Sequence, residues 1–121
     1  MIVTPTKEHD SEGAKLLLTR GKEYEVLAIE AGYYRVLTDP ESDPYGNDPV
    51  LYESSCFKVH DYKEPSFWVT EIHDGELYRG PFAWLRYFFE DFHDGNQKAR
   101  EEFQWQLKKY YPRTWQERYS S

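Results

Sequence analysis

The N-terminal half of the chain alternates short apolar runs with turn-forming residues. The runs 24–30 (YEVLAIE), 33–37 (YYRVL) and 57–60 (FKVH) are rich in β-branched and aromatic residues, as strands are. Residues 31–32 (AG) predict a tight turn between the first two runs, and residues 54–56 predict another turn before the third. Shorter extended runs are predicted at 15–20 and 50–52. The pattern therefore predicts a half that is built from strands.

The hydrophobic spacing changes after residue 65 and predicts a β-hairpin followed by helices. Residues 73–76 (HDGE) contain Asp-Gly between two apolar runs, which is a strong hairpin signal. Pro81 suits the first turn of a helix, while Asn96 and Pro112 suit the start and the end of a second helix. The stripes of the two predicted helices are Phe82, Leu85, Phe88, Phe89 and Phe92, and then Ala99, Phe103, Leu107 and Tyr110. With a short connection between them, they predict an αα-hairpin.

The predicted strands also carry a resemblance. The segments 18–27 (LTRGKEYEVL), 33–37 (YYRVL) and 50–59 (VLYESSCFKV) resemble an SH3-like β-barrel of the kind found in small bacterial and phage proteins. Some proteins of this size and style are immunity proteins that neutralise secreted toxins. The resemblance covers about half of the chain and implies an SH3-like barrel over residues 1–63. Together with the hairpin and the two aromatic-rich helices predicted over residues 64–121, it gives an expected α+β fold that is packed as one unit.

The composition predicts that this chain folds, although it is acidic. Its 121 residues include 15 Lys and Arg against 22 Asp and Glu, a net charge of −7, and 18% of them are aromatic. Disordered acidic chains are poor in aromatic residues, so rings are expected to supply much of a folded core. The acidity argues against nucleic acid as a partner, because binding it needs a basic footprint. Residues 96–121 carry 6 basic and 3 acidic residues, too small an excess to change that expectation.

The sequence carries no targeting signal, so we expect a cytoplasmic protein with no membrane attachment. The first residues (MIVTPTKEHDSEG) lack the apolar segment of a signal peptide. No apolar run approaches the ~20 residues that a membrane-spanning helix needs. Cys56 is the sole cysteine, so an internal disulfide and a zinc site of the CxxC type are both excluded.

Candidate catalytic chemistry is sparse. Each of the four histidines precedes an aspartate, at residues 9–10, 60–61, 73–74 and 93–94. Sequence neighbours point in different directions, so a metal site would need several distant pairs to converge. Cys56, beside Phe57, is expected to be a packing cysteine, and no phosphate-binding glycine loop is present. We therefore predict no enzymatic activity and no cofactor or metal, with a metal-dependent hydrolase as an alternative.

Two features suggest surfaces for a protein partner. Residues 39–49 (DPESDPYGNDP) predict an acidic loop that is too rich in proline for regular structure. Trp105 falls away from the apolar stripe of the second helix, among charged residues, where a tryptophan is typical of an interface. A solvated loop and a tail that folds back over Trp105 are the alternatives. The candidate partner-binding residues are Asp39, Glu41, Asp43, Tyr45, Asp48 and Trp105.

These observations favour a binding protein over an enzyme. Acidic charge, small size and rings on predicted surfaces suggest an inhibitor of the immunity-protein kind, with a basic partner such as a bacterial toxin. A phage or mobile-element protein that binds a host factor is a second possibility, and the hydrolase is a third. The sequence leaves the identity of the partner open.

Overall fold

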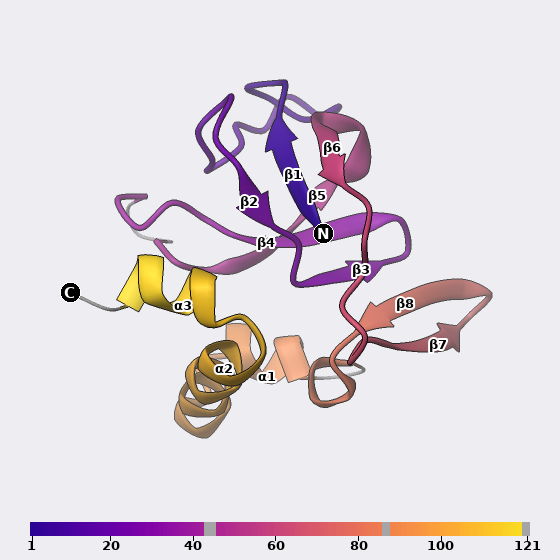
Figure 1. Cartoon of the computed structure of the whole chain (residues 1–121), viewed down its shortest axis with the longest axis vertical. Helices are drawn as coiled ribbons and strands as arrows, with labels where there is room; N and C mark the ends of the chain where they lie inside the picture. The colour runs from indigo at the N-terminus through magenta and orange to yellow at the C-terminus, as the bar shows by residue number, and fades with distance from the viewer. Residues whose placement is uncertain (43–45, 86–87, 120–121) are drawn as a thin grey trace. The chain divides into compact units, whose positions relative to one another are not determined.

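The chain folds into two compact units, Met1–Gly80 and Pro81–Ser121. The computed structural model describes residues 1–42, 46–85 and 88–119. The first unit is built from strands and the second from helices, as Figure 1 shows along the colour gradient. The α+β prediction is confirmed.

Eight strands form the first unit, and they belong to two antiparallel sheets. The three-stranded sheet has the order β2-β1-β6 and the five-stranded sheet has the order β5-β4-β3-β8-β7. The strands are β1 (Ile2–Pro5), β2 (Tyr24–Glu25), β3 (Ala28–Glu30), β4 (Tyr33–Leu37), β5 (Pro49–Glu53), β6 (Phe57–Asp61), β7 (Val69–His73) and β8 (Glu76–Gly80). A 3₁₀ turn, η1 (Ser54–Cys56), stands where the sequence predicts a tight turn.

The predicted strand 24–30 is in fact two strands in different sheets. Val26 and Leu27, at its middle, are both fully buried. Their backbone N–H groups donate in different directions, Val26 to the carbonyl of Met1 and Leu27 to the carbonyl of Arg35, each at 2.9 Å. The chain therefore leaves the small sheet and enters the large one at this point. Uninterrupted apolar sequence hides the change because both faces are buried there.

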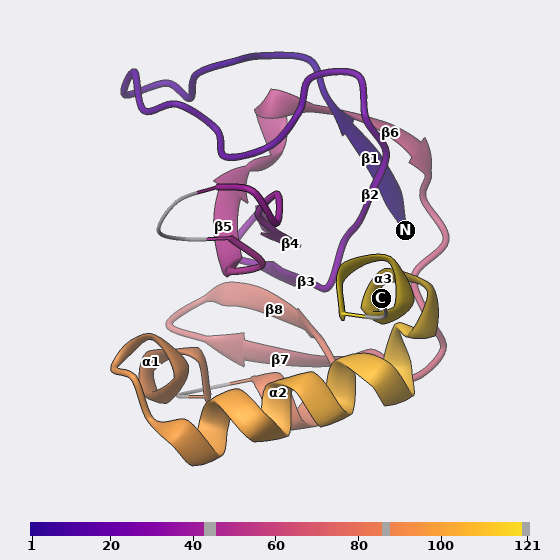
Figure 2. The ribbon, with the colours of Figure 1, turned by 90° about the vertical axis from the view of Figure 1, so that its left-hand side faces the viewer.

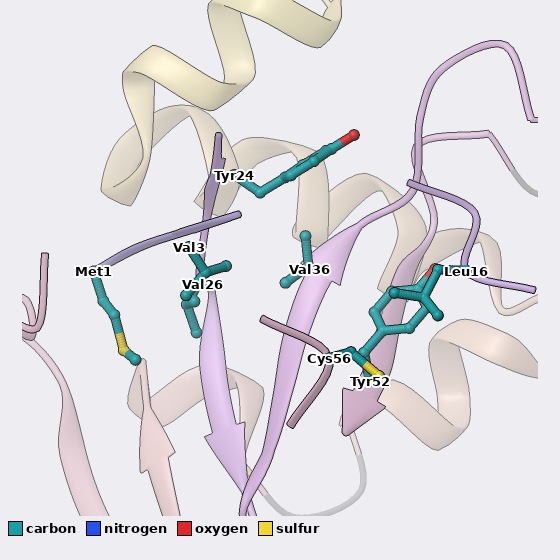
Figure 3. Close-up of a cluster of buried hydrophobic side chains, with 8 residues drawn as sticks. All are labelled: Met1, Val3, Leu16, Tyr24, Val26, Val36, Tyr52 and Cys56. Carbon is teal, nitrogen blue, oxygen red and sulfur yellow. The ribbon is translucent and has the colours of Figure 1, made fainter. Parts of the chain in front are cut away.

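The two sheets share one apolar core. Its buried side chains include Val3 on β1, Tyr24 on β2, Val36 on β4 and Tyr52 on β5, and Figure 3 draws them. Among the described residues, the strand pairing does not close into a barrel. The SH3-like barrel over residues 1–63 therefore stays a prediction.

The β7–β8 hairpin is part of the five-stranded sheet, because β8 pairs with β3 in the register Ile29 with Arg79 and Glu30 with Tyr78. The sequence placed this hairpin with the helices, whereas the structure divides the chain after Gly80. The junction is tight: a Cβ at Gly80 would lie 2.9 Å from the Cβ of Ala28 on β3. A glycine at this position lets β8 approach β3.

The second unit contains more elements than the predicted αα-hairpin. It has a 3₁₀ turn η2 (Phe82–Trp84) and the helices α1 (Phe88–His93), α2 (Gln97–Tyr110) and α3 (Pro112–Tyr119). The single helix predicted from Pro81 is wrong, since Leu85 after η2 is extended. Asn96 caps α2 as predicted, with its side chain accepting from the N–H of Ala99 at 3.0 Å. In Figure 2, α3 follows directly from the end of α2.

Rings pack together in the core of the second unit. Trp84 lies with its ring centroid 5.0 Å from that of Phe103, 5.7 Å from Tyr111 and 5.9 Å from Phe89. Trp84 is 1% exposed, while Phe82, which the predicted stripe included, is 70% exposed. The difference follows from the 3₁₀ turn, which changes the direction of each side chain relative to an α-helix. No helix of the described residues is long and apolar enough to cross a membrane.

Candidate functional site

The acidic loop has one of its carboxylates inside the protein. Asp39 is 5% exposed, and its carboxylate accepts from the hydroxyl of Thr19 at 2.6 Å and of Tyr24 at 2.5 Å. Its backbone N–H also donates to the carbonyl of Leu17 at 2.9 Å. The expectation that Asp39 faces a partner is therefore not met, because its hydrogen bonds hold separate segments of the first unit together.

The phenols near this network stay protonated at neutral pH. Burial, together with the hydrogen bond to Asp39, raises the pKa of Tyr24 to about 12. Burial also raises the pKa of Tyr52 to about 12. A group that titrates so far above neutrality is a poor acid or base at pH 7. We therefore regard the network as structural.

The rest of the acidic loop lies closer to solvent. Glu41 is exposed and Asp48 is half-buried. The backbone of Asp48 is bound to Thr38, which donates its N–H to the carbonyl of Asp48 at 2.9 Å and accepts the N–H of Asp48 on its hydroxyl at 2.8 Å. Asp43 and Tyr45, the other candidates on this loop, lie outside the described residues.

Trp105 lies on the exposed face of α2, with 63% of its surface accessible. Nζ of Lys109 lies 5.3 Å from the centre of the indole ring. The alternative in which the tail folds over Trp105 is not observed, because the tail forms α3 and the described residues leave the ring open. Trp115 on α3 is half-buried instead, with Nζ of Lys108 4.7 Å from its ring.

Two of the histidines have different side-chain partners. Nε2 of His60 lies 2.7 Å from the hydroxyl of Thr4, and Nε2 of His73 lies 3.0 Å from the carboxylate of Glu71. Across residues 1–42, 46–85 and 88–119, no three His, Cys, Asp or Glu residues form a group that could hold a metal ion. The hydrolase alternative therefore has no metal site in that part of the chain.

Two of the aspartates that follow a histidine lie in turns, and the cysteine is part of the core. Asp10 accepts the backbone N–H groups of Glu12 and Ala14 on one carboxylate oxygen, each at 2.9 Å. Asp74 has a positive φ of 52° in the hairpin turn. Cys56 is 1% exposed and burial raises the pKa of its thiol, which disfavours the reactive thiolate.

The β7–β8 hairpin carries a surface that the sequence reasoning did not single out. Ile72 and Leu77 are directly opposite each other across the two strands, and they are 68% and 49% exposed. We call this pair, with the carboxylates of Glu71, Asp74 and Glu76, the hairpin surface. Alternation along each strand puts Glu71 and Glu76 on the opposite face from Ile72 and Leu77. The signal was present in the sequence, because residues equidistant from an Asp-Gly turn become cross-strand neighbours.

A mainly basic hollow lies elsewhere on the first unit, in contrast to the acidic hairpin surface. It has a volume of about 180 Å³ and is lined by Lys7, Glu8, Lys15, Leu16, Leu18 and Arg20. Three cations and one carboxylate border it, and in chemical terms it suits a small anion better than a cation. The residues that line it lie in loops, outside the strands and helices.

Neither a protein-family model, nor a curated protein, nor a solved structure matches this chain. Its function is therefore argued from its own surfaces. Of these, the hairpin surface combines exposed apolar area with acidic charge on a regular backbone.

Proposed function

We propose that this protein is a non-enzymatic binding protein that holds a basic protein partner, as a small acidic inhibitor of the immunity-protein kind does. The observation that carries the proposal is the exposed cross-strand pair Ile72 and Leu77 on the β7–β8 hairpin. Large apolar side chains that gather on a surface are typical of sites that a partner covers.

Burial of this pair would supply binding energy. Covering an Ile or Leu side chain fully stabilises a complex by roughly 1.5–3 kcal/mol, and these two are still largely open to solvent. Because a few buried anchors dominate the energy of most interfaces, one such pair can matter more than a broad charged surface.

The charge of the protein favours a basic partner. The net charge is −7, and the hairpin surface contributes two exposed carboxylates, Asp74 and Glu76, while the carboxylate of Glu71 is mostly buried beside His73. Opposite charge speeds encounter between proteins and disfavours wrong partners, and both effects weaken as salt increases. Glu41 would add to the same field from the acidic loop, and Trp105 would act as a further anchor on the second unit.

Two finer interpretations belong to this proposal. We propose that the first unit is a relative of SH3-like barrels, with the sequence resemblance and the change of sheet at Val26 and Leu27 in support. We also propose a cytoplasmic protein, which fits a chain whose single cysteine is buried and unpaired.

Capture of the partner tests the proposal. The full chain, immobilised and exposed to a lysate of the organism that encodes it, should retain a basic protein that mass spectrometry identifies. The variant Ile72→Lys should lose it, while the matched variant Phe82→Lys, at another exposed apolar residue, should keep it. Equal capture by both variants, or recovery of this chain alone, would contradict the proposal. The identity of the captured protein separates a toxin inhibitor from a protein that binds a host factor.

A further inference from the structure

The outer strands of the two sheets differ in how well they are protected from pairing with another chain. Proteins guard such edges with short strands, Pro, Lys and irregular pairing. In the small sheet, β2 is two residues long, and β6 carries Lys58 and pairs irregularly with β1. In the large sheet, β5 begins with Pro49.

Strand β7 has none of these four guards, although charged side chains also protect sheet edges and β7 carries one carboxylate, Glu71. It runs for five residues (VTEIH) without Pro or Lys, and it pairs with β8 in an unbroken register from Val69 with Gly80 to His73 with Glu76. It lies at the end of the strand order, with β8 as its neighbour on one side (Figure 2).

The hairpin geometry shows which backbone groups of β7 point outward. Asp74 and Gly75 have φ values of 52° and 81°, the pattern of a type I′ turn. In such a two-residue hairpin the flanking residues His73 and Glu76 bond to each other, and the next pair along, Ile72 and Leu77, directs its backbone groups away from the partner strand. The carbonyl of Leu77 indeed accepts from Ala31 on the far side of β8, at 2.9 Å.

It follows that Thr70 and Ile72 present their N–H and C=O groups along the outer edge of β7. Both residues are exposed, Ile72 to 68%. An extended chain that lies beside β7 can therefore bond to it as a further strand of the sheet.

We propose that the outer edge of β7 accepts an extended, basic segment of the protein partner as an additional strand. This inference rests on the proposed function and names how that partner is held. Because side chains alternate, the added strand would set a basic residue opposite Glu71, whose carboxylate lies 3.0 Å from Nε2 of His73, and apolar residues opposite Thr70 and Ile72.

Charge distinguishes this occupant from a second copy of the chain. Glu71 is the central residue of β7. In the antiparallel register centred on Glu71, two copies would place Glu71 directly opposite Glu71, and like charges in that position destabilise a sheet. Each copy would also bring a net charge of −7. A basic segment would bring neither a like charge opposite Glu71 nor a second large negative net charge.

Short synthetic peptides test the inference on the full chain. The probe is a fluorescein-labelled peptide that alternates Lys and Ile, and its control has the same composition in an order without alternation. Fluorescence anisotropy should show the alternating peptide binding at least tenfold more tightly than the control, which carries the same charge. Equal affinities would overturn the inference, because charge alone would then explain the binding.

A backbone variant locates the peptide. Thr70→Pro removes an N–H that the β7–β8 pairing does not use, so the hairpin should survive, whereas Thr70→Ala keeps the N–H. We expect Thr70→Pro to weaken peptide binding at least tenfold and Thr70→Ala to leave it unchanged. Amide hydrogen exchange on the unaltered protein gives the same test if the proline unfolds the hairpin: the peptide should slow exchange at Thr70 and Ile72. Unchanged exchange there would overturn the inference.

The outcomes also separate this inference from the proposed function. If Thr70→Pro still captures the basic partner that Ile72→Lys loses, the function stands and strand addition is wrong. If the peptide binds at β7 but no basic protein is captured, strand addition stands and the proposed function is wrong. A dimer of the unaltered chain that Thr70→Pro abolishes in sedimentation would identify a second copy as the occupant and contradict the proposal.

Discussion

Two acidic segments of the first unit are used in opposite ways. The loop that begins at Asp39 directs its first carboxylate inward, where it accepts two hydroxyl hydrogen bonds. The β7–β8 hairpin instead exposes the carboxylates of Asp74 in its turn and of Glu76 on one face, and it leaves Ile72 open to solvent on the other face. Sequence made the loop look like the binding surface, because charge and proline are conspicuous. The comparison teaches that a charged segment can have a structural role, while a less conspicuous hairpin exposes the surface better suited to binding a partner.

The largest effect on stability is expected from removing the inward carboxylate. Asp39→Ala leaves the hydroxyl of Tyr24 without its acceptor in the protein interior, so we expect a loss of about 2–4 kcal/mol in the free energy of unfolding. Glu41→Ala, on the same loop but exposed, should change it by less than about 0.5 kcal/mol. Urea denaturation measures both. Similar losses in the free energy of unfolding for the two variants would contradict the claim that the inward carboxylate is structural and the outward one is not.

Alkaline pH should also destabilise the region around Asp39. The folded protein holds the protons of Tyr24 and Tyr52 to about pH 12, while an unfolded chain releases them near pH 10. The stabilisation is complete below pH 10 and is lost as pH rises from 10 to 12, by about 2–3 kcal/mol for each phenol. Tyr52→Phe should therefore flatten this decline in denaturation measured across that range. An unaltered decline in the variant would show that Tyr52 is not responsible.

A smaller loss is expected where the hairpin joins the sheet. Gly80→Ala would bring a Cβ within 2.9 Å of Ala28, and overpacking of this kind costs about 1–3 kcal/mol. Thr70→Ala, on the exposed edge, is the matched control and should be close to neutral. Thermal unfolding of both proteins measures the difference, and a neutral Gly80→Ala would count against close packing of β8 on β3.

The smallest structural effect is expected at Trp105. Trp105→Phe should leave the free energy of unfolding within about 0.5 kcal/mol of the unaltered protein, because the ring is 63% exposed. The variant should nevertheless lose the tryptophan fluorescence that acrylamide quenches most readily, while Trp84, at 1% exposure, stays protected. Loss of a protected component instead would mean that Trp105 is covered.

The sequence predicted those elements correctly that depend on a single strong local signal, such as a cap or a turn. The strand Tyr33–Leu37, the turn at Ser54–Cys56 and the Asn96 cap of α2 all agree with the structure. The Asp-Gly hairpin was predicted too, although its register with β3 was not. Each of these elements is determined by residues within a few positions of one another.

The remaining features depend on contacts between distant segments. Burial of Asp39 depends on Thr19 and Tyr24, which no local pattern connects to it. The helix α3 begins at Pro112, which was predicted only to end the preceding helix, although proline also suits a first helical turn. Ile72 on the outer strand β7 and Leu77 on β8 are both exposed, so their exposure depends on what packs on that face of the sheet, which no local pattern gives.

Charge reversal on the two acidic segments tests the central claim most directly. With the captured basic partner, the association rate constant would be measured for Glu71→Lys/Glu76→Lys on the hairpin and for Glu41→Lys/Asp48→Lys on the loop. Each variant changes two carboxylates, so the effect on net charge is the same. We predict that the hairpin variant associates at least tenfold more slowly than the loop variant. Equal rates, or a larger effect from the loop, would contradict the claim that the hairpin is the binding surface.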